Sequence, residues 1–323
     1  MIKRLIPIII CACLASVAAA QSYQYDLPRR GEGVNAFLLR NGYAIEQYKR
    51  IFLDLNKDKL TAAGELRLGV KYKLPLRSDT ATEPLLGQKY AKVKIENHRL
   101  EGATYYLVSG HGGPDPGAMA TRAGFAMCED EYAYDVVLRC ARHLLSMGAR
   151  VHLIIQDKTD GIRDGERLNY DDDETCEGQP IPLDQNERLK QRCDAINRHF
   201  ETEKGGYCRA VFVHIDSRSR SERIDVFAYH YAGSKAGKAL ANRIMSTIEN
   251  KYKQHQPKRG FSGNVSDRNL FVLRGTNPVA VFLELGNIQN DLDQQRFLIP
   301  DNREALGKWI AEGLAEDYIR SKK

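Results

Sequence analysis

From residue 104 onward, short apolar runs alternate with longer stretches in which apolar residues recur at helical spacing. The apolar runs predict strands at 104–109, 150–155, 209–215, 225–231, 269–273 and 279–285. The helically spaced stretches predict helices at 129–147, 184–200, 234–252 and 302–318. This alternation predicts an α/β domain, with a mostly parallel twisted sheet covered by helices on both faces. Ligands of such domains bind at the carboxyl ends of the strands.

Residues 24–76 follow a different order: a turn at Gly31-Glu32-Gly33, two helical patterns, and an alternating stretch at 66–75 that predicts a strand. This small α+β region resembles a LysM module, a fold that binds glycans containing N-acetylglucosamine. A generic packing module without a ligand is the alternative. Residues 77–103 begin with a polar stretch and are expected to link this region to a catalytic domain at 104–320.

The first twenty residues differ from the rest of the chain. Lys3 and Arg4 precede an apolar run that ends in three alanines at 18–20, which is typical of a secretory signal peptide. A buried N-terminal helix and, because of Cys13, a lipoprotein signal are the alternatives. No later stretch is apolar enough to cross a membrane. We therefore expect a secreted, periplasmic or cell-wall-associated protein with no membrane span once the signal is removed.

The net charge and the cysteine content limit which binding partners and metal sites the protein is expected to have. The formal net charge of +6 falls to +4 without Lys3 and Arg4, which is too small to indicate nucleic-acid binding. It is compatible with an anionic polymer such as a cell wall. Five cysteines remain after the signal, at 128, 140, 176, 193 and 208, with no C-x-x-C among them. One or two disulfides are possible, and a cysteine-based zinc knuckle is not expected.

Candidate chemistry gathers where the predicted strands end. His111 lies in the stretch SGHGGPDPGA directly after the first strand, His214 near the end of another, and Glu284 near the end of the last. Glu131 stands in the first turn of the helix that follows the first strand. Two imidazoles and a carboxylate form a common catalytic zinc set with one position left open for water. A second carboxylate would serve as general base.

Phosphate binding is the other interpretation of SGHGGPDPGA, because glycine-rich turns after strands cradle phosphates. The stretch contains neither G-x-G-x-x-G nor G-x-x-x-x-G-K-[ST], and a long loop rather than a helix follows it. Nucleotide binding is therefore not expected.

Several ordered motifs together resemble one family. They are SGHGGPDPGA, an acidic helix start, Leu189-x-x-Arg192 followed by Ala195-Ile196-Asn197, VFVHID at 211–216, and VAVFLELGNIQN at 279–290. Over residues 105–318 the chain resembles the zinc-dependent N-acetylmuramoyl-L-alanine amidases of type 3, which have a phosphorylase/hydrolase-like α/β fold. The resemblance implies Zn²⁺ held by His111, Glu131 and His214, with Glu284 as the catalytic carboxylate.

Two of these assignments have competitors. The family usually has serine two residues before the second histidine, where this chain has Phe212, and a shift by two would put Asp216 in the ligand position. We prefer His214, because family members often carry Asp or Asn where Asp216 stands. Glu131 is preferred over its acidic neighbours Glu129 and Asp130 because the helical pattern that follows has the family's spacing; the neighbours would then favour the helix dipole.

Two segments depart from the family pattern. Residues 157–182 form a polar insertion that is either a solvated surface loop or a regulatory lid with Glu174 or Glu177 reaching the metal. The loop at 217–223 carries Arg218 and Arg220, whose guanidinium groups could meet stem-peptide carboxylates, and Asn287 is a further candidate for substrate binding. A basic surface turn is the alternative for that loop.

The resemblance implies a secreted hydrolase that cuts the amide bond between N-acetylmuramic acid and L-alanine in peptidoglycan. Peptidoglycan, through its glycan strand and stem peptide, is the expected partner, and any activator protein is unknown. A zinc carboxypeptidase or peptidase acting on wall peptides and a non-catalytic glycan-binding wall protein are the alternatives.

Overall fold

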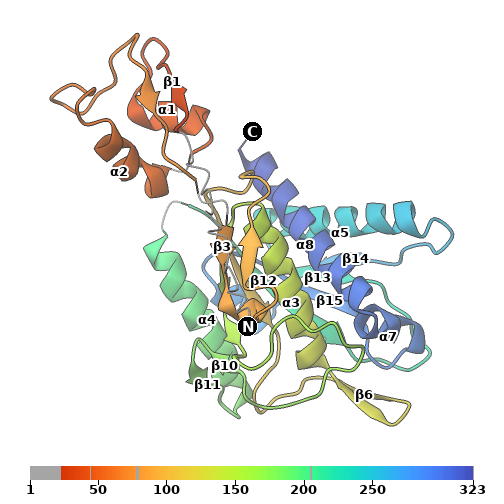
Figure 1. The fold of residues 1–323 in the computed structure, drawn as a ribbon. Coiled ribbons are helices and arrows are strands. Elements are labelled where there is room, and N and C mark those ends of the chain that lie inside the picture. The colour runs from red at the N-terminus through yellow and green to blue at the C-terminus, as the bar shows by residue number, and fades with distance from the viewer. Residues whose placement is uncertain (1–22, 44, 78–79, 204–205, 323) are drawn as a thin grey trace, which may run out of the picture.

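A computed structural model describes residues 23–43, 45–77, 80–203 and 206–322, so the predicted secretory signal lies outside the described residues. Its main feature is a six-stranded sheet with the order β14-β13-β15-β12-β5-β8 (Figure 1). Only the β13–β15 pair is antiparallel within this sheet, which confirms the predicted mostly parallel arrangement. The strands are β5 (Ala103–Ser109), β8 (Arg150–Leu153), β12 (Tyr207–Asp216), β13 (Phe227–His230), β14 (Asn264–Asp267) and β15 (Val279–Asn287).

The three central strands set the position of the site. All seven residues of β5 are buried, as the unbroken apolar run predicts for a strand covered on both faces. Strand β12 pairs in parallel with β5 and β15, in a register that places Val213 beside Ser109 and His214 beside Glu284. Parallel pairing therefore brings the carboxyl ends of these three strands to the same edge.

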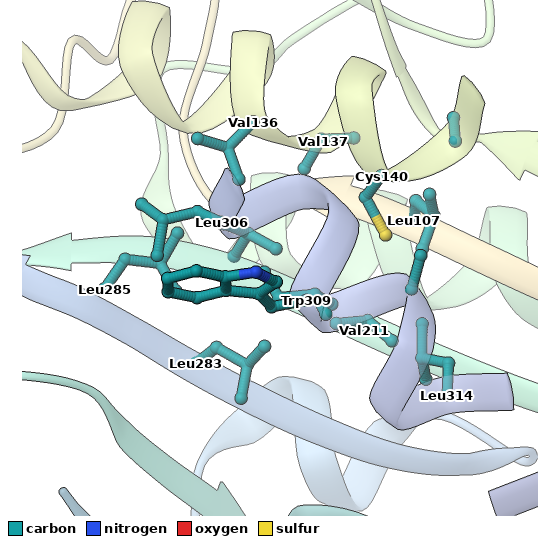
Figure 2. Close-up of a cluster of buried hydrophobic side chains, with 14 of the residues drawn as sticks. Leu107, Val136, Val137, Cys140, Val211, Leu283, Leu285, Leu306, Trp309 and Leu314 are labelled. Carbon is teal, nitrogen blue, oxygen red and sulfur yellow. The ribbon is translucent and has the colours of Figure 1, made fainter. Parts of the chain in front are cut away.

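Helices cover both faces of the sheet. Helices α3 (Glu129–Ser146), α5 (Lys235–His255) and α8 (Pro300–Ser321) share one apolar core with one face. Helix α4 (Gln185–Thr202) and the short α6 (Phe271–Gly275) share a second core with the other. Figure 2 shows the larger core, where Trp309 of α8 lies among leucines from the sheet and its own helix. Each buried leucine contributes about 1.5–3 kcal/mol of transfer free energy.

Two glycines let α8 approach its neighbours closely. A Cβ atom on Gly307 would lie 2.8 Å from the backbone nitrogen of Cys140 in α3, and one on Gly313 would lie 2.7 Å from the Cα of Ile244 in α5. Larger residues at either position would push the helices apart, so these glycines explain how one C-terminal helix packs against both others.

One predicted strand is wrong. Residues 269–273 do not form a strand, because Phe271–Gly275 forms the short helix α6, and the strand of this region, β14, comes earlier. A short apolar run cannot be distinguished from one buried helical turn by periodicity alone, and Val272 and Leu273 are buried in the core shared with α4. Sequence analysis also missed the hairpin β6 (Met119–Arg122) and β7 (Phe125–Cys128), and helix α7 (Asp291–Leu298).

The N-terminal region has the order β1 (Tyr25–Asp26), α1 (Val34–Arg40), α2 (Ile45–Leu55), β2 (Tyr72–Lys73), with the two strands antiparallel. Both predicted helices are present, whereas β1 was not predicted and the strand expected over 66–75 shortens to two residues. Phe37, Phe52 and Tyr72 pack together in a separate core. The region stands apart from the sheet in Figure 1.

Most of the predicted linker at 77–103 packs onto the larger domain. Strands β3 (Thr80–Thr82) and β4 (Lys92–Lys94) pair around a short 3₁₀ helix, η1 (Pro84–Leu86). The core around α3 includes three apolar side chains from this segment, Leu86, Val93 and Leu100. Burial removes them from water, whereas an extended linker would leave them exposed. No helix within the described residues is long and apolar enough to cross a membrane.

Candidate metal centre

His111 and His214 meet at the carboxyl edge of the sheet, as their positions at the strand ends predict. His111 follows β5 in the glycine-rich turn, and His214 is near the end of β12. Their ring centroids lie 4.9 Å apart, with the planes nearly perpendicular at 84°. The ring of His214 also stacks on Phe282 of β15, with the centroids 4.1 Å apart, which fixes its orientation.

The carboxylate that joins the two histidines is Glu129. Its Oε1 lies 3.0 Å from Nδ1 of His214 and 3.4 Å from Nε2 of His111. One nitrogen of each histidine and one Glu129 oxygen lie within 4.8 Å of one another. The same carboxylate accepts hydrogen bonds from the backbone N–H groups of Ala118 and Ile215, at 2.8 and 2.9 Å. These bonds hold it between the glycine-rich turn and β12.

Glu131, the ligand that the resemblance implies, does not lie with the histidines. Glu131 instead pairs with Arg163 at 2.7 Å and accepts the backbone N–H of Asp171 at 3.0 Å. Residues two apart on an α-helix point about 200° apart, so Glu129 and Glu131 cannot reach one site from the start of α3. Glu129 is the first residue of the helix, directly after β7. The apolar periodicity of α3 predicted the helix. It did not identify which of the three acidic residues at 129–131 faces the edge of the sheet.

The pKa shifts of Glu129 and His214 favour the protonation states that bind a metal ion. Burial raises the pKa of Glu129, but the hydrogen bond with His214 and the charge of His111 outweigh it, and the pKa lies below its ordinary value. Burial lowers the pKa of His214, and Glu129 offsets only part of that effect. An ionised carboxylate and a neutral imidazole are the forms that bind metal ions.

Two residues that sequence analysis did not single out orient His111. The Oδ2 atom of Asp115 lies 2.8 Å from Nδ1 of His111 and 2.7 Å from Nη2 of Arg188 on α4. A carboxylate on Nδ1 fixes the tautomer and directs Nε2 toward Glu129, as in the carboxylate–histidine pairs of metal sites. Asp115 stands in the SGHGGPDPGA stretch, but spacing alone does not show that it contacts the histidine.

Gly110 is required by the close approach of His214. A Cβ atom at residue 110 would lie 1.8 Å from Cε1 of the His214 ring, a distance that no packing accommodates. We expect Gly110→Ala to displace His214 and to lower the affinity for the metal at least about tenfold, the range seen when ligand orientation is lost. Metal titration of the purified variant measures this.

The matched control is Gly165→Ala, where a Cβ would meet nothing closer than 3.5 Å. Equal metal affinity of the Gly110→Ala variant and the wild type would mean that His214 is not positioned as described.

Glu284 lies beside this cluster on the neighbouring strand. It is the register partner of His214, so both side chains project from the same face of the sheet. Its Oε2 atom is buried and has no hydrogen-bond partner among the described residues. Burial, followed by the charges of Glu129 and Asp216, raises the pKa of Glu284 well above its ordinary value. A buried carboxylate without a partner is costly, and such perturbed groups concentrate at functional sites.

A cavity of about 280 Å³ opens beside the two histidines, between the sheet and helices α4 and α6. Its wall is mostly apolar, with Leu189, Phe212 and Phe282 among its members, while Arg192 gives the wall a positive charge. Phe212, the residue that departs from the family pattern, therefore lines this cavity. The cavity is large enough to receive part of a substrate.

The remaining sequence candidates occupy different positions. Asp216, the alternative to His214, pairs with Arg218 at 2.6 Å and lies outside the histidine cluster. Arg220 is exposed and pairs with Asp291. Asn287 is fully buried, and its amide donates to the carbonyl oxygens of Ser219 and Glu222, so it holds the 217–223 loop in place.

The 157–182 insertion does not place a carboxylate on the histidine cluster. Glu174 accepts the backbone N–H of Gly113 at 2.6 Å, and Glu177 pairs with His199 and with Arg198. Ile162 and Leu168 are buried in the larger core and anchor the insertion, while many of its other residues are exposed. All five cysteines at 128, 140, 176, 193 and 208 are free and buried.

Comparison with known proteins gives one family. A family model described as N-acetylmuramoyl-L-alanine amidase (Amidase_3) matches residues 106–316. A curated relative, the probable cell wall amidase LytH of Staphylococcus aureus, is 26% identical over 221 residues, which is 68% of this chain and 60% of the relative. The chain thus spans less than two thirds of that relative's length.

Solved structures of amidases have a similar fold. The CwlD amidase of Clostridioides difficile, solved in complex with the GerS lipoprotein, is 18% identical. The similarity covers 67% of this chain and 98% of that one, with a TM-score of 0.50. This likeness supports the arrangement of the sheet and its helices, while the family match covers every residue of the histidine cluster.

Proposed function

Because the chain belongs to the N-acetylmuramoyl-L-alanine amidase family, we propose that it is a zinc hydrolase that cleaves the amide bond between N-acetylmuramic acid and L-alanine in peptidoglycan. The observation that carries the proposal is the convergence of His111, Glu129 and His214 on one point with Glu284 beside them. Family membership indicates which bond would be cleaved. The convergence of these side chains indicates which residues would carry out the cleavage.

The residues present fit zinc. Two imidazole nitrogens and one carboxylate oxygen form a donor set found at catalytic zinc sites, and three protein ligands leave a position for water or substrate. The donor set contains no thiol, although Cys128 directly precedes Glu129. A bound zinc ion would polarise the scissile carbonyl and lower the pKa of a water molecule to about 7.

Glu284 is the proton-transfer group of the proposed reaction. It takes a proton from the attacking water and passes it to the nitrogen of the leaving amine, which must be protonated to depart. Burial favours the protonated form of Glu284, and a bound cation nearby would favour the ionised form that accepts the water's proton.

Other surfaces would hold the polymer. The cavity next to His214 would receive part of the stem peptide. Arg218, whose charge acts on Glu284, would offer a cation to a stem-peptide carboxylate. The β1-α1-α2-β2 region contains the two helices and the final strand expected for a LysM-like module, which would bind the glycan strand. Action on peptidoglycan requires export, and we propose that the first twenty residues provide it as a signal peptide.

Digestion of purified peptidoglycan by the zinc-loaded protein tests the proposed activity. We expect mass spectrometry to show intact stem peptides with a free L-alanine amino group and glycan strands with free lactyl carboxylates. Release of single terminal amino acids would identify a carboxypeptidase instead. Binding to peptidoglycan without new products would identify a wall-binding protein.

A further inference from the structure

A second group of acidic side chains lies behind the glycine-rich turn. Asp130 and Glu131 from the first turn of α3 and Glu174 from the 157–182 insertion each offer an oxygen within 4.8 Å of the others. All three residues are buried, with exposed fractions of 1%, 1% and 4%. The three side chains are separate from the histidine cluster, and the proposed reaction uses none of them.

The charge of this group is only partly balanced. Arg163 pairs with Glu131, but it also pairs with Asp160. Asp130 and Glu174 form no ion pair among the residues that the structure describes. Two buried carboxylates therefore lack a counter-charge, and burying unpaired charge is costly.

One oxygen in the group has no partner. The Oδ1 atom of Asp130 accepts the backbone N–H of Glu131 at 2.8 Å, while Oδ2 is buried and has no hydrogen-bond partner within the described ranges. A buried, unpartnered carboxylate oxygen next to two further carboxylates is a position that a cation would stabilise.

We infer that Asp130, Glu131 and Glu174 form a calcium site, distinct from the proposed zinc site. All the donors are hard carboxylate oxygens, which suit Ca²⁺, Mg²⁺ or Mn²⁺ better than the softer transition metals that prefer imidazole or thiolate ligands. Mg²⁺ demands near-ideal octahedral geometry and gives up its water reluctantly, whereas Ca²⁺ accepts an irregular set of carboxylate oxygens that water or carbonyl oxygens complete. A divalent cation supplies the two charges that Arg163 leaves unbalanced.

The position of the site suggests what the ion does. Glu174 accepts the backbone N–H of Gly113, and the hydroxyl of Tyr170 donates to the carbonyl oxygen of Gly113 at 3.4 Å. Two hydrogen bonds therefore connect the insertion to the turn that carries His111. A cation shared by Glu174 and the start of α3 would fasten the insertion to both this turn and the helix that provides Glu129. Calcium would thus stabilise the frame of the metal centre without touching substrate.

Calorimetric titration of CaCl₂ into the full chain, freed of calcium and saturated with zinc, tests this inference independently of amidase activity. We expect one Ca²⁺ per chain, weaker binding of Mg²⁺ in a parallel titration, and a rise of a few degrees in the thermal midpoint with Ca²⁺. Asp130→Asn and Glu174→Gln should each weaken Ca²⁺ binding at least about tenfold, because each removes one of three charged ligands.

Asp172→Asn is the matched control, because Asp172 is an exposed carboxylate of the same insertion, outside the cluster. It should bind Ca²⁺ like the wild type. Without calcium, Asp130→Asn should unfold at the same temperature as the wild type or higher, since the Oδ2 atom that it replaces has no hydrogen-bond partner to lose; this separates lost binding from misfolding. A wild-type protein that binds no Ca²⁺ beyond its zinc, or equal Ca²⁺ affinity in Asp130→Asn, would overturn the inference.

Discussion

Replacing Glu284 by glutamine is expected to lower kcat for peptidoglycan cleavage by about 10²–10⁴-fold, the contribution of a positioned general acid–base group. Glutamine keeps the shape of the side chain but cannot accept the water's proton. Bound zinc should be unchanged, because Glu284 is not one of the three residues whose donor atoms converge. Product release measured by mass spectrometry, together with zinc analysis of the same sample, gives both values.

Stability provides a second measurement on the same variant. Because burial raises the pKa of Glu284, its ionisation opposes folding at any pH above the ordinary glutamate pKa. In zinc-free protein at neutral pH, Glu284→Gln should therefore unfold at the same temperature or higher. The control is Glu187→Gln, an exposed carboxylate on α4, which should leave activity and stability unchanged. Near wild-type kcat in Glu284→Gln would remove Glu284 from the reaction.

Glu129→Gln should weaken zinc binding, whereas Glu131→Gln should leave it unchanged. Loss of an outer-shell partner typically costs 10–100-fold in metal affinity, so loss of the only ionised ligand in Glu129→Gln should cost at least about 100-fold, and activity should disappear with the metal. Glu131→Gln should keep zinc at wild-type affinity, because Glu131 contacts Arg163 and not the histidines. Competition titrations with a chromogenic chelator measure both affinities.

The pair has its own internal control, since the two variants remove the same group from the same helical turn. If Glu131→Gln loses zinc and Glu129→Gln keeps it, the helix start is rotated relative to the structure, and the original assignment from the resemblance holds. If neither variant loses zinc, the metal is held elsewhere.

The fold could be predicted from sequence wherever periodicity was long and unambiguous. The buried run of β5 and the amphipathic pattern of α3 gave elements within a residue or two of their observed ends. Short segments were harder: Phe271–Gly275 has too few residues for a helical period to show. Residues 80–103 appeared to be a linker because their buried leucines are spaced irregularly, and burial there depends on α3, which is distant in sequence.

The site was predictable to the extent that strand ends determine it. His111, His214 and Glu284 follow from where parallel strands stop, and the register of β12 and β15 sets the last two side by side. Glu129 could not be chosen from its acidic neighbours, because the choice depends on the rotation of α3 relative to the sheet. Asp115 and Arg188 were not identified, because their contact joins a turn to a helix 73 residues away.

The most direct test of this account is X-ray diffraction from zinc-loaded crystals at energies on either side of the zinc absorption edge. We predict an anomalous peak bonded to one nitrogen each of His111 and His214 and to the carboxylate of Glu129, with Glu131 still paired to Arg163. A zinc peak ligated by Glu131, or no peak between the two histidines in active protein, would contradict it.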